Sequence, residues 1–154
     1  MKKVLRVFAW IIVIPIAVAF IGMVYIRNAN DDPKVWHIDP EGAAWTGKRK
    51  NFKVSPEGDD KVHKSPVFEM SAAELMTNFQ KMALEQPDTV LLGERDGFAT
   101  FVQRTKLMQY PDYISVKAVD VEGGSALFIN SRSRFGYSDG GLNKKRILSW
   151  LKKL

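Results

Sequence analysis

The sequence predicts an α+β fold: a mainly antiparallel sheet with two packed helices, preceded by one N-terminal transmembrane helix. Three observations lead to this prediction. The chain opens with a long apolar run, two later segments carry apolar residues at helical spacing, and three strand-like segments between them are joined by short turns. Because the strands follow one another instead of alternating with helices, the pattern is typical of the α+β class.

The apolar run extends from Val7 to Ile26 without a charge. At about 1.5 Å per residue it reaches roughly 30 Å, the thickness of a bilayer's hydrocarbon core. Trp10 and Tyr25 suit the two membrane interfaces, where amphipathic rings settle. A cleaved signal peptide would have a shorter apolar stretch and a small-residue cleavage site, which residues 27–33 do not offer. We therefore predict a cytoplasmic tip and transmembrane anchor over residues 1–27.

Charges on the two sides of the run predict its orientation. Lys2, Lys3 and Arg6 precede it, whereas Arg27 alone follows it, beside two aspartates. The positive-inside tendency places the N-terminus in the cytoplasm and residues 28–154 outside. In a bacterium this is a single-pass protein of the inner membrane with a periplasmic C-terminal domain.

The net charge of +6 belongs largely to the anchor. The first 27 residues hold four of the 23 basic residues and none of the 17 acidic ones, so the remainder carries only +2. Such a balance gives no support to nucleic-acid binding. The chain has no cysteine, and neither His37 nor His63 has a second histidine at helical or strand spacing. We expect no metal site and no cofactor.

Residues 28–64 are predicted to be an irregular strap, because prolines, glycines and charges are dense there. Trp36, Trp45 and Phe52 nevertheless lie within it. A free linker has little use for tryptophans, so we expect the strap to pack on the folded α+β domain of residues 65–154.

The domain is expected to begin with a short strand over residues 66–70, followed by a helix. Ser71 and Glu74 form a capping box at its start, and Pro87 ends it. Its apolar face recurs every three or four residues and consists of Leu75, Met76, Phe79, Met82 and Ala83.

Three strands are predicted over residues 98–107, 113–120 and 125–133, with an edge strand at 89–92. Short connections between the three favour an antiparallel meander. The middle strand alternates clearly: Ile114, Val116 and Ala118 share one face, and Ser115 and Lys117 the other. Two helices could cover one face of this sheet and leave the other for the strap or for a ligand.

The last helix is predicted from about Leu142. Its apolar stripe comprises Ile147, Trp150, Leu151 and Leu154, and its other face is wholly basic. That basic face could contact anionic lipid or remain solvated.

The candidate contact surface lies near the end of the last strand. Arg132 and Arg134 are two residues apart, so both project from one face, and Arg104 on a neighbouring strand could join them. Guanidinium groups beside a helix N-terminus are what an anionic head group needs. The surface adds three loop residues: Tyr137, Ser138 and Asp139.

A structural role is the alternative for the same residues. Arg134 could pair with Asp139 or Asp112, and Asp139 or Ser138 could cap the helix.

Four stretches resemble, in the same order, characteristic stretches of the domain-of-unknown-function 1499 family. They are VWHIDP (35–40), KSPVFEMSAAEL (64–75), FATFVQRTKLMQYPDYISVKA (98–118) and SRSRFGYSDGGLNKKRI (131–147). The resemblance as a whole extends over nearly all of residues 33–154. Gly140 departs from the family pattern, where a leucine-like residue is expected. The resemblance implies a mostly bacterial protein, often with an N-terminal membrane span, and it implies no activity or catalytic residue.

Three functional hypotheses follow. The first is a non-enzymatic accessory or interaction module at the periplasmic face of the inner membrane, with the bilayer and a membrane protein as partners. The second is a binding protein for an amphiphilic or anionic ligand such as a lipid. The third is an enzyme acting on a phosphorylated or acidic substrate, with Asp139 or Asp112 as the acid or base.

Overall fold

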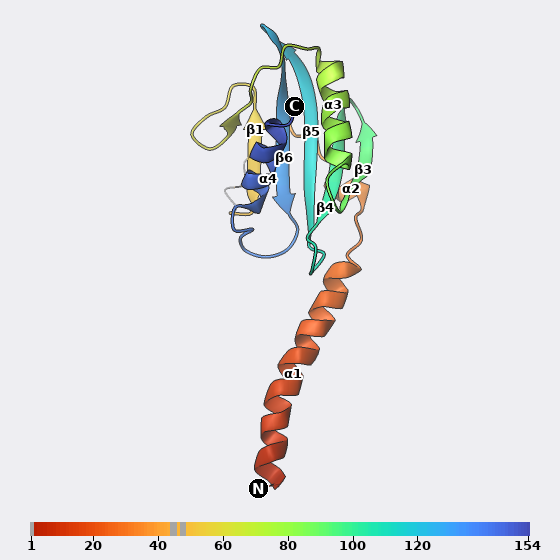
Figure 1. Cartoon of the computed structure of the whole chain (residues 1–154), viewed down its shortest axis with the longest axis vertical. Helices are drawn as coiled ribbons and strands as arrows, with labels where there is room; N and C mark the ends of the chain where they lie inside the picture. Colours follow the sequence, from red (N-terminus) through yellow and green to blue (C-terminus); the bar gives the residue numbers. More distant parts are fainter. Residues whose placement is uncertain (1, 44–45, 47–48) are drawn as a thin grey trace.

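The computed structural model describes residues 2–43, 46 and 49–154, and Figure 1 shows their arrangement. An apolar helix is followed by a six-stranded sheet with helices on one face. The elements, in chain order, are α1 (Lys2–Arg27), α2 (Pro33–Trp36), β1 (Asn51–Ser55), β2 (His63–Lys64), α3 (Ala72–Leu84), β3 (Thr89–Arg95), β4 (Phe98–Arg104), β5 (Pro111–Val121), β6 (Gly124–Ser133) and α4 (Leu142–Leu151).

The strand order in the sheet is β2-β1-β6-β5-β4-β3. All neighbouring strands are antiparallel except β1 and β2, which run parallel. The α+β class is therefore confirmed, and so is the antiparallel meander of its central strands. Gly97 and Gly123 occupy the turns before β4 and β6 with φ of 79° and 84°, a left-handed conformation that favours glycine.

Helices α3 and α4 cover one face of the sheet (Figure 1). Ile114 and Val116 of β5 point into this layer, as the alternation predicted, and both are fully buried. Phe79 of α3 lies at the centre, with its ring 6.1 Å from that of Phe101 and 5.8 Å from that of Trp150. Because this core occupies one face of β5 and β6, only the opposite face of these strands is left for the strap.

The opposite face carries Tyr113, Ser115 and Lys117, and the strap lies over it. Trp36 stacks on Tyr113, with ring centroids 4.0 Å apart and planes 6° from parallel. Further along the strap, Glu41 forms an ion pair with Lys117, with 2.5 Å between Oε2 and Nζ. Trp45, which was also expected to pack here, lies outside the described residues.

Several segments differ from the sequence expectation, including residues 33–36 and 63–64, which were assigned to the irregular strap but form α2 and β2. Residues 51–55, assigned to the irregular strap, form β1, because Phe52 and Val54 alternate onto the helix-covered face. Residues 66–70 form only an isolated bridge between Phe68 and Ser125. Gly124 makes this bridge possible, since a side chain there would collide with the carbonyl oxygen of Phe68.

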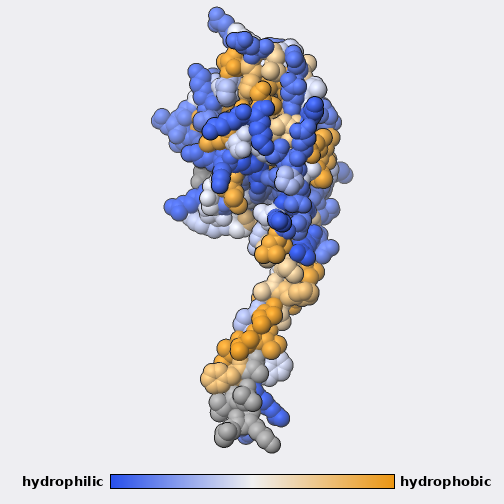
Figure 2. All heavy atoms as spheres, viewed as in Figure 1, coloured by the Kyte–Doolittle hydropathy of each residue, from blue (hydrophilic) through white to orange (hydrophobic). Residues whose placement is uncertain are grey.

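Helix α1 projects away from the sheet as an apolar rod, in contrast to the largely hydrophilic domain (Figure 2). Its segment from Trp10 to Arg27 has a mean hydropathy of 2.2 and is not buried by the rest of the chain. The helix is long and apolar enough to cross a membrane, and a signal sequence would meet the same description.

Replacing Phe79 by alanine should lower the free energy of unfolding by about 3–5 kcal/mol, because the vacated volume lies between both helices and the sheet. Denaturant unfolding measures this. The control is Leu84→Ala in the same helix; its side chain is half exposed, so its cost should be about 1 kcal/mol or less. Equal losses in the two variants would contradict this description of the core.

Candidate functional site

A partly buried carboxylate near the start of the strap makes its first contact with the sheet. Asp31 Oδ2 accepts a hydrogen bond of 2.7 Å from Nη2 of Arg104, and its Oδ1 accepts one of 2.7 Å from the Tyr113 hydroxyl. The same Arg104 nitrogen donates to the carbonyl of Ala29 at 3.1 Å. Burial, followed by the hydrogen bond to Asp31, raises the pKa of Tyr113 to about 12. Asp31 is thus held by two donors from neighbouring strands.

The next strap contact is Trp36, which stacks on Tyr113 and lies beside two arginines. The guanidinium carbons of Arg132 and Arg134 each lie 5.8 Å from the Trp36 ring centroid, a distance typical of cation–π contacts. Arg132 also donates from Nη2 to the carbonyl of Trp36. Arg134 donates from Nη1 to the carbonyl of Asn30 at 2.7 Å.

We use the name arginine clamp for four residues on the sheet side that hold strap residues 29–36. They are Arg104, Tyr113, Arg132 and Arg134. Its members share one face because of strand register. Tyr113 lies opposite both Arg132 on β6 and Val102 on β4, and Arg104 is two residues beyond Val102. The spacing of Arg132 and Arg134 predicted their common face, and Arg104 joins them as expected from a neighbouring strand. Spacing could not predict that their acceptors lie in the chain itself.

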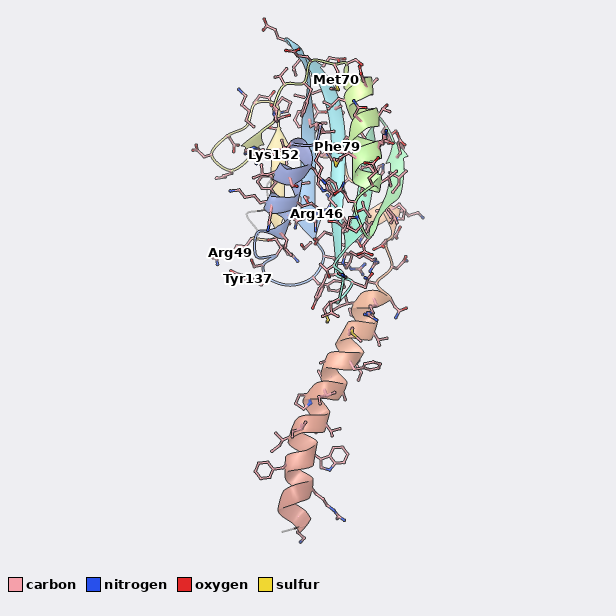
Figure 3. The ribbon with its side chains drawn as sticks, viewed as in Figure 1. Arg49, Met70, Phe79, Tyr137, Arg146 and Lys152 are labelled. Atoms are coloured by element: carbon pink, nitrogen blue, oxygen red, sulfur yellow. The ribbon has the colours of Figure 1, made fainter. Side chains whose placement is uncertain are left out.

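The other three predicted site residues lie elsewhere, in the loop between β6 and α4. Asp139 accepts hydrogen bonds from the backbone N–H groups of Gly141 and Asn143, at 2.9 and 2.8 Å, and so caps the start of α4. Ser138 accepts one from Gly140 at 3.2 Å. Tyr137 is 81% exposed and lies beside Arg49 at the tip of the domain (Figure 3).

Asp112 pairs with an arginine that sequence analysis did not select. Its Oδ2 accepts a 2.7 Å hydrogen bond from Arg146 of α4, and its side chain is almost fully buried. Arg146 also donates to Asn143, whose amide binds Ser133 and the carbonyl of Lys50. Arg134 therefore pairs with neither Asp139 nor Asp112. Both carboxylates considered for acid–base chemistry are occupied by structural donors.

A pocket of about 290 Å³ lies between the β4–β5 turn and the β6–α4 loop. Its wall combines apolar and polar groups from Thr105, Tyr110, Asp112, Ser133, Phe135, Gly136, Ser138, Asp139 and Leu142. Phe135 contacts Tyr25 of α1 edge-on, with centroids 6.0 Å apart. Arg27 at the end of α1 donates to the carbonyl of Leu107 at 2.9 Å. The pocket therefore lies at the end of the domain where α1 joins it.

A buried histidine adjoins the clamp. His37 Nδ1 lies 2.9 Å from the hydroxyl of Thr100, which lies 2.9 Å from that of Ser115, and its ring stacks on Phe98. Burial, with further contributions from Arg95 and Arg132, lowers the pKa of His37. Within the described ranges, no group of three or more histidines and carboxylates is arranged to hold a metal ion.

Comparison with known proteins gave one match. A family model described as "Protein of unknown function (DUF1499)" matches residues 32–154. No curated protein and no solved structure matched significantly. The matched region contains the whole sheet-side part of the clamp and the pocket.

Asp31→Asn should lower the free energy of unfolding by about 1–3 kcal/mol, because Arg104 and Tyr113 lose a charged acceptor. It should also speed proteolysis within residues 28–36. Thermal unfolding and limited proteolysis measure the two effects. Asp60→Asn, at an exposed position, is the control and should change neither. If Asp31→Asn resisted heat and proteolysis as well as the wild type does, the clamp would not be what holds the strap.

His37 should make stability depend on pH. Its folded-state pKa lies below the ordinary value of 6.5, so the unfolded chain takes up the proton first as pH falls. Stability is therefore retained above pH 6.5 and lost as pH falls below it. Unfolding curves from pH 7.5 to 5 should show a smaller loss in His37→Gln than in the wild type. Parallel losses in the two proteins would contradict the role of His37.

Proposed function

The chain belongs to the DUF1499 family, a family of unknown function, and from the arginine clamp we propose that it is a single-pass membrane protein presenting a non-enzymatic interaction domain. The domain works as an accessory module at the periplasmic face of the inner membrane. Its partners are the bilayer, through α1, and a membrane protein that lies beside it.

The clamp is the observation that carries this proposal. Only Asn28 separates the end of α1 from Ala29, the first clamped residue. Arg27 and Tyr25 contact the domain directly. A domain that only needed tethering would not require these contacts. A rigid connection instead supports a function that depends on how the domain is oriented over the membrane.

The surface around the end of α1 has the composition of a membrane interface. Leu107 is 76% exposed at the β4–β5 turn, and Tyr137 is 81% exposed in the β6–α4 loop with Arg49 beside it. Aromatic and basic side chains settle at the head-group level. When α1 spans a bilayer, the β4–β5 turn and the β6–α4 loop rest on the outer surface of that bilayer. The helices α3 and α4 then face sideways, where a neighbouring membrane protein can reach them (Figure 1).

Binding of an amphiphile is the second candidate function. The observation that favours it is the pocket beside Phe135, which lies next to Tyr25 at the end of the span. Lipid leaving the outer leaflet would meet this opening first. The pocket includes Ser138 and Asp139 but none of the three arginines, which are held by the strap.

Orientation can be measured by cysteine labelling, for which the cysteine-free chain is a clean background. With α1 as an uncleaved anchor, Glu57→Cys should react with a membrane-impermeant maleimide in intact bacterial cells permeabilised only at the outer membrane. Lys3→Cys should react only after lysis. Both variants should remain in the membrane fraction at full length. Labelling of Lys3→Cys in intact cells, or a shortened soluble product, would contradict the proposal.

Native mass spectrometry of the full-length protein, released gently from its membrane, distinguishes the two candidate functions. A bound polypeptide supports the interaction module. A lipid adduct that is lost in Leu142→Asp, which places a charge in the pocket wall, supports the amphiphile-binding candidate instead. A bare monomer would contradict a tightly bound partner of either kind.

A further inference from the structure

We propose that the strap-covered face of the sheet binds a small oxyanion, a phosphate or carboxylate group, between Arg132 and Lys53. This site is separate from the membrane-proximal pocket. It rests on two buried cations that are diagonal neighbours on the sheet and form no ion pair in the part of the chain that the structure describes.

Arg132 is the first of these cations. Only 8% of this residue is exposed, and burial lowers its pKa to about 10. Nη2 donates to the carbonyl of Trp36. Among the described residues, Nε and Nη1 have no hydrogen-bond partner although both atoms are buried. These two nitrogens carry three of the five N–H groups of a guanidinium, so most of its donor capacity is unused.

Lys53 is the second. It is also 8% exposed, and burial lowers its pKa. Its ammonium donates to the carbonyl of Ala43 in the strap, and within the described ranges no carboxylate lies within ion-pair distance. Asp59 opposes this lowering of the pKa but forms no ion pair with Lys53. A carbonyl supplies only a partial charge, so no ion pair in the described part of the chain neutralises the ammonium.

Strand register brings the two cations together. Lys53 on β1 lies opposite Asn130 of β6, and Arg132 on β6 lies opposite Asn51 of β1. The two are therefore diagonal neighbours on one face, a relation in which long side chains reach each other. Asn130, itself nearly buried, occupies the position between them and adds an amide donor to the same patch.

Among the described residues, three partly buried cations of the domain have the carboxylate partner that Arg132 and Lys53 lack. Arg104 pairs with Asp31, Arg146 with Asp112, and Lys117 with Glu41. A desolvated charge is costly unless an opposite charge compensates it. Where the described residues provide no carboxylate, a bound anion supplies the compensating negative charge. Arginine and lysine side chains are suited to bind phosphate and carboxylate groups. The closed setting beneath the strap restricts the ligand to a small group.

The test uses the full-length protein in detergent micelles and three probes: inorganic phosphate, sulfate and acetate. Each is titrated against sodium chloride at equal ionic strength while thermal unfolding is followed. We expect at least one probe to raise the unfolding midpoint saturably, by about 5 °C or more at a hundredfold excess over its Kd. Native mass spectrometry of the protein as isolated then distinguishes an inorganic ion from a lipid phosphate by the mass of the adduct.

Variants locate the site. Arg132→Gln and Lys53→Met should each weaken binding of the effective probe at least tenfold. Lys53→Met should fold even if Arg132→Gln does not, because it removes an uncompensated charge and leaves the clamp intact. The controls are Arg95→Gln and Lys64→Met, which alter exposed cations and should bind as the wild type does.

Two results would overturn the proposal. The first is a wild-type midpoint that responds to phosphate, sulfate and acetate no more than to chloride. The second is a response that survives unchanged in Lys53→Met, since a nonspecific salt effect would not depend on that side chain.

Discussion

The carboxylate of Asp31, held between Arg104 and Tyr113, determines where the apolar helix joins the sheet. Asp31 lies four residues after the last residue of α1, so its position leaves the chain between them little freedom. Trp36, stacked on Tyr113, then fixes the direction in which the strap continues. The contacts of Tyr25 and Arg27 with the tip of the domain depend on this attachment, and so does the proposed orientation over a membrane.

The two faces of the sheet are covered by different physical means. On the helix side, apolar side chains of α3 and α4 meet the buried alternate residues of β5 and β6, and burial of apolar area stabilises the contact. The strap has few apolar side chains and exposes backbone carbonyls toward the sheet. Those carbonyls need donors once water is excluded. Arginines on the sheet supply them at residues 29, 30 and 36.

The sequence predicts well what depends on local pattern. Alternation of Ile114 and Val116 with Ser115 identified the two faces of β5, and the spacing of Arg132 and Arg134 identified their common face. Strand β1 was not predicted, because two alternating apolar residues within a polar, turn-rich stretch are too weak a signal. The bridge that replaced the strand at residues 66–70 depends on a close backbone approach at Gly124.

Contacts between residues distant in the sequence could not be predicted, for a different reason. Arg146 lies 34 residues from Asp112, and only the packing of α4 against the sheet brings them to 2.7 Å. The clamp arginines were recognised as an anion-binding pattern, but most of their acceptors are backbone carbonyls, which every residue has. Burial without a counter-ion, the basis of the proposed oxyanion site, can be recognised only once the strap is in place.

The central claim is that the clamp fixes the domain rigidly to α1. Spin labels at Ile21→Cys in α1 and Gln80→Cys in α3, with the protein in lipid nanodiscs, test it most directly through pulsed electron–electron distance measurement. A rigid attachment predicts one narrow distance distribution, which broadens when Asp31→Asn is added. A distribution that is already broad in the parent protein would contradict the account, because the domain would then be a tethered body and the clamp incidental to its position.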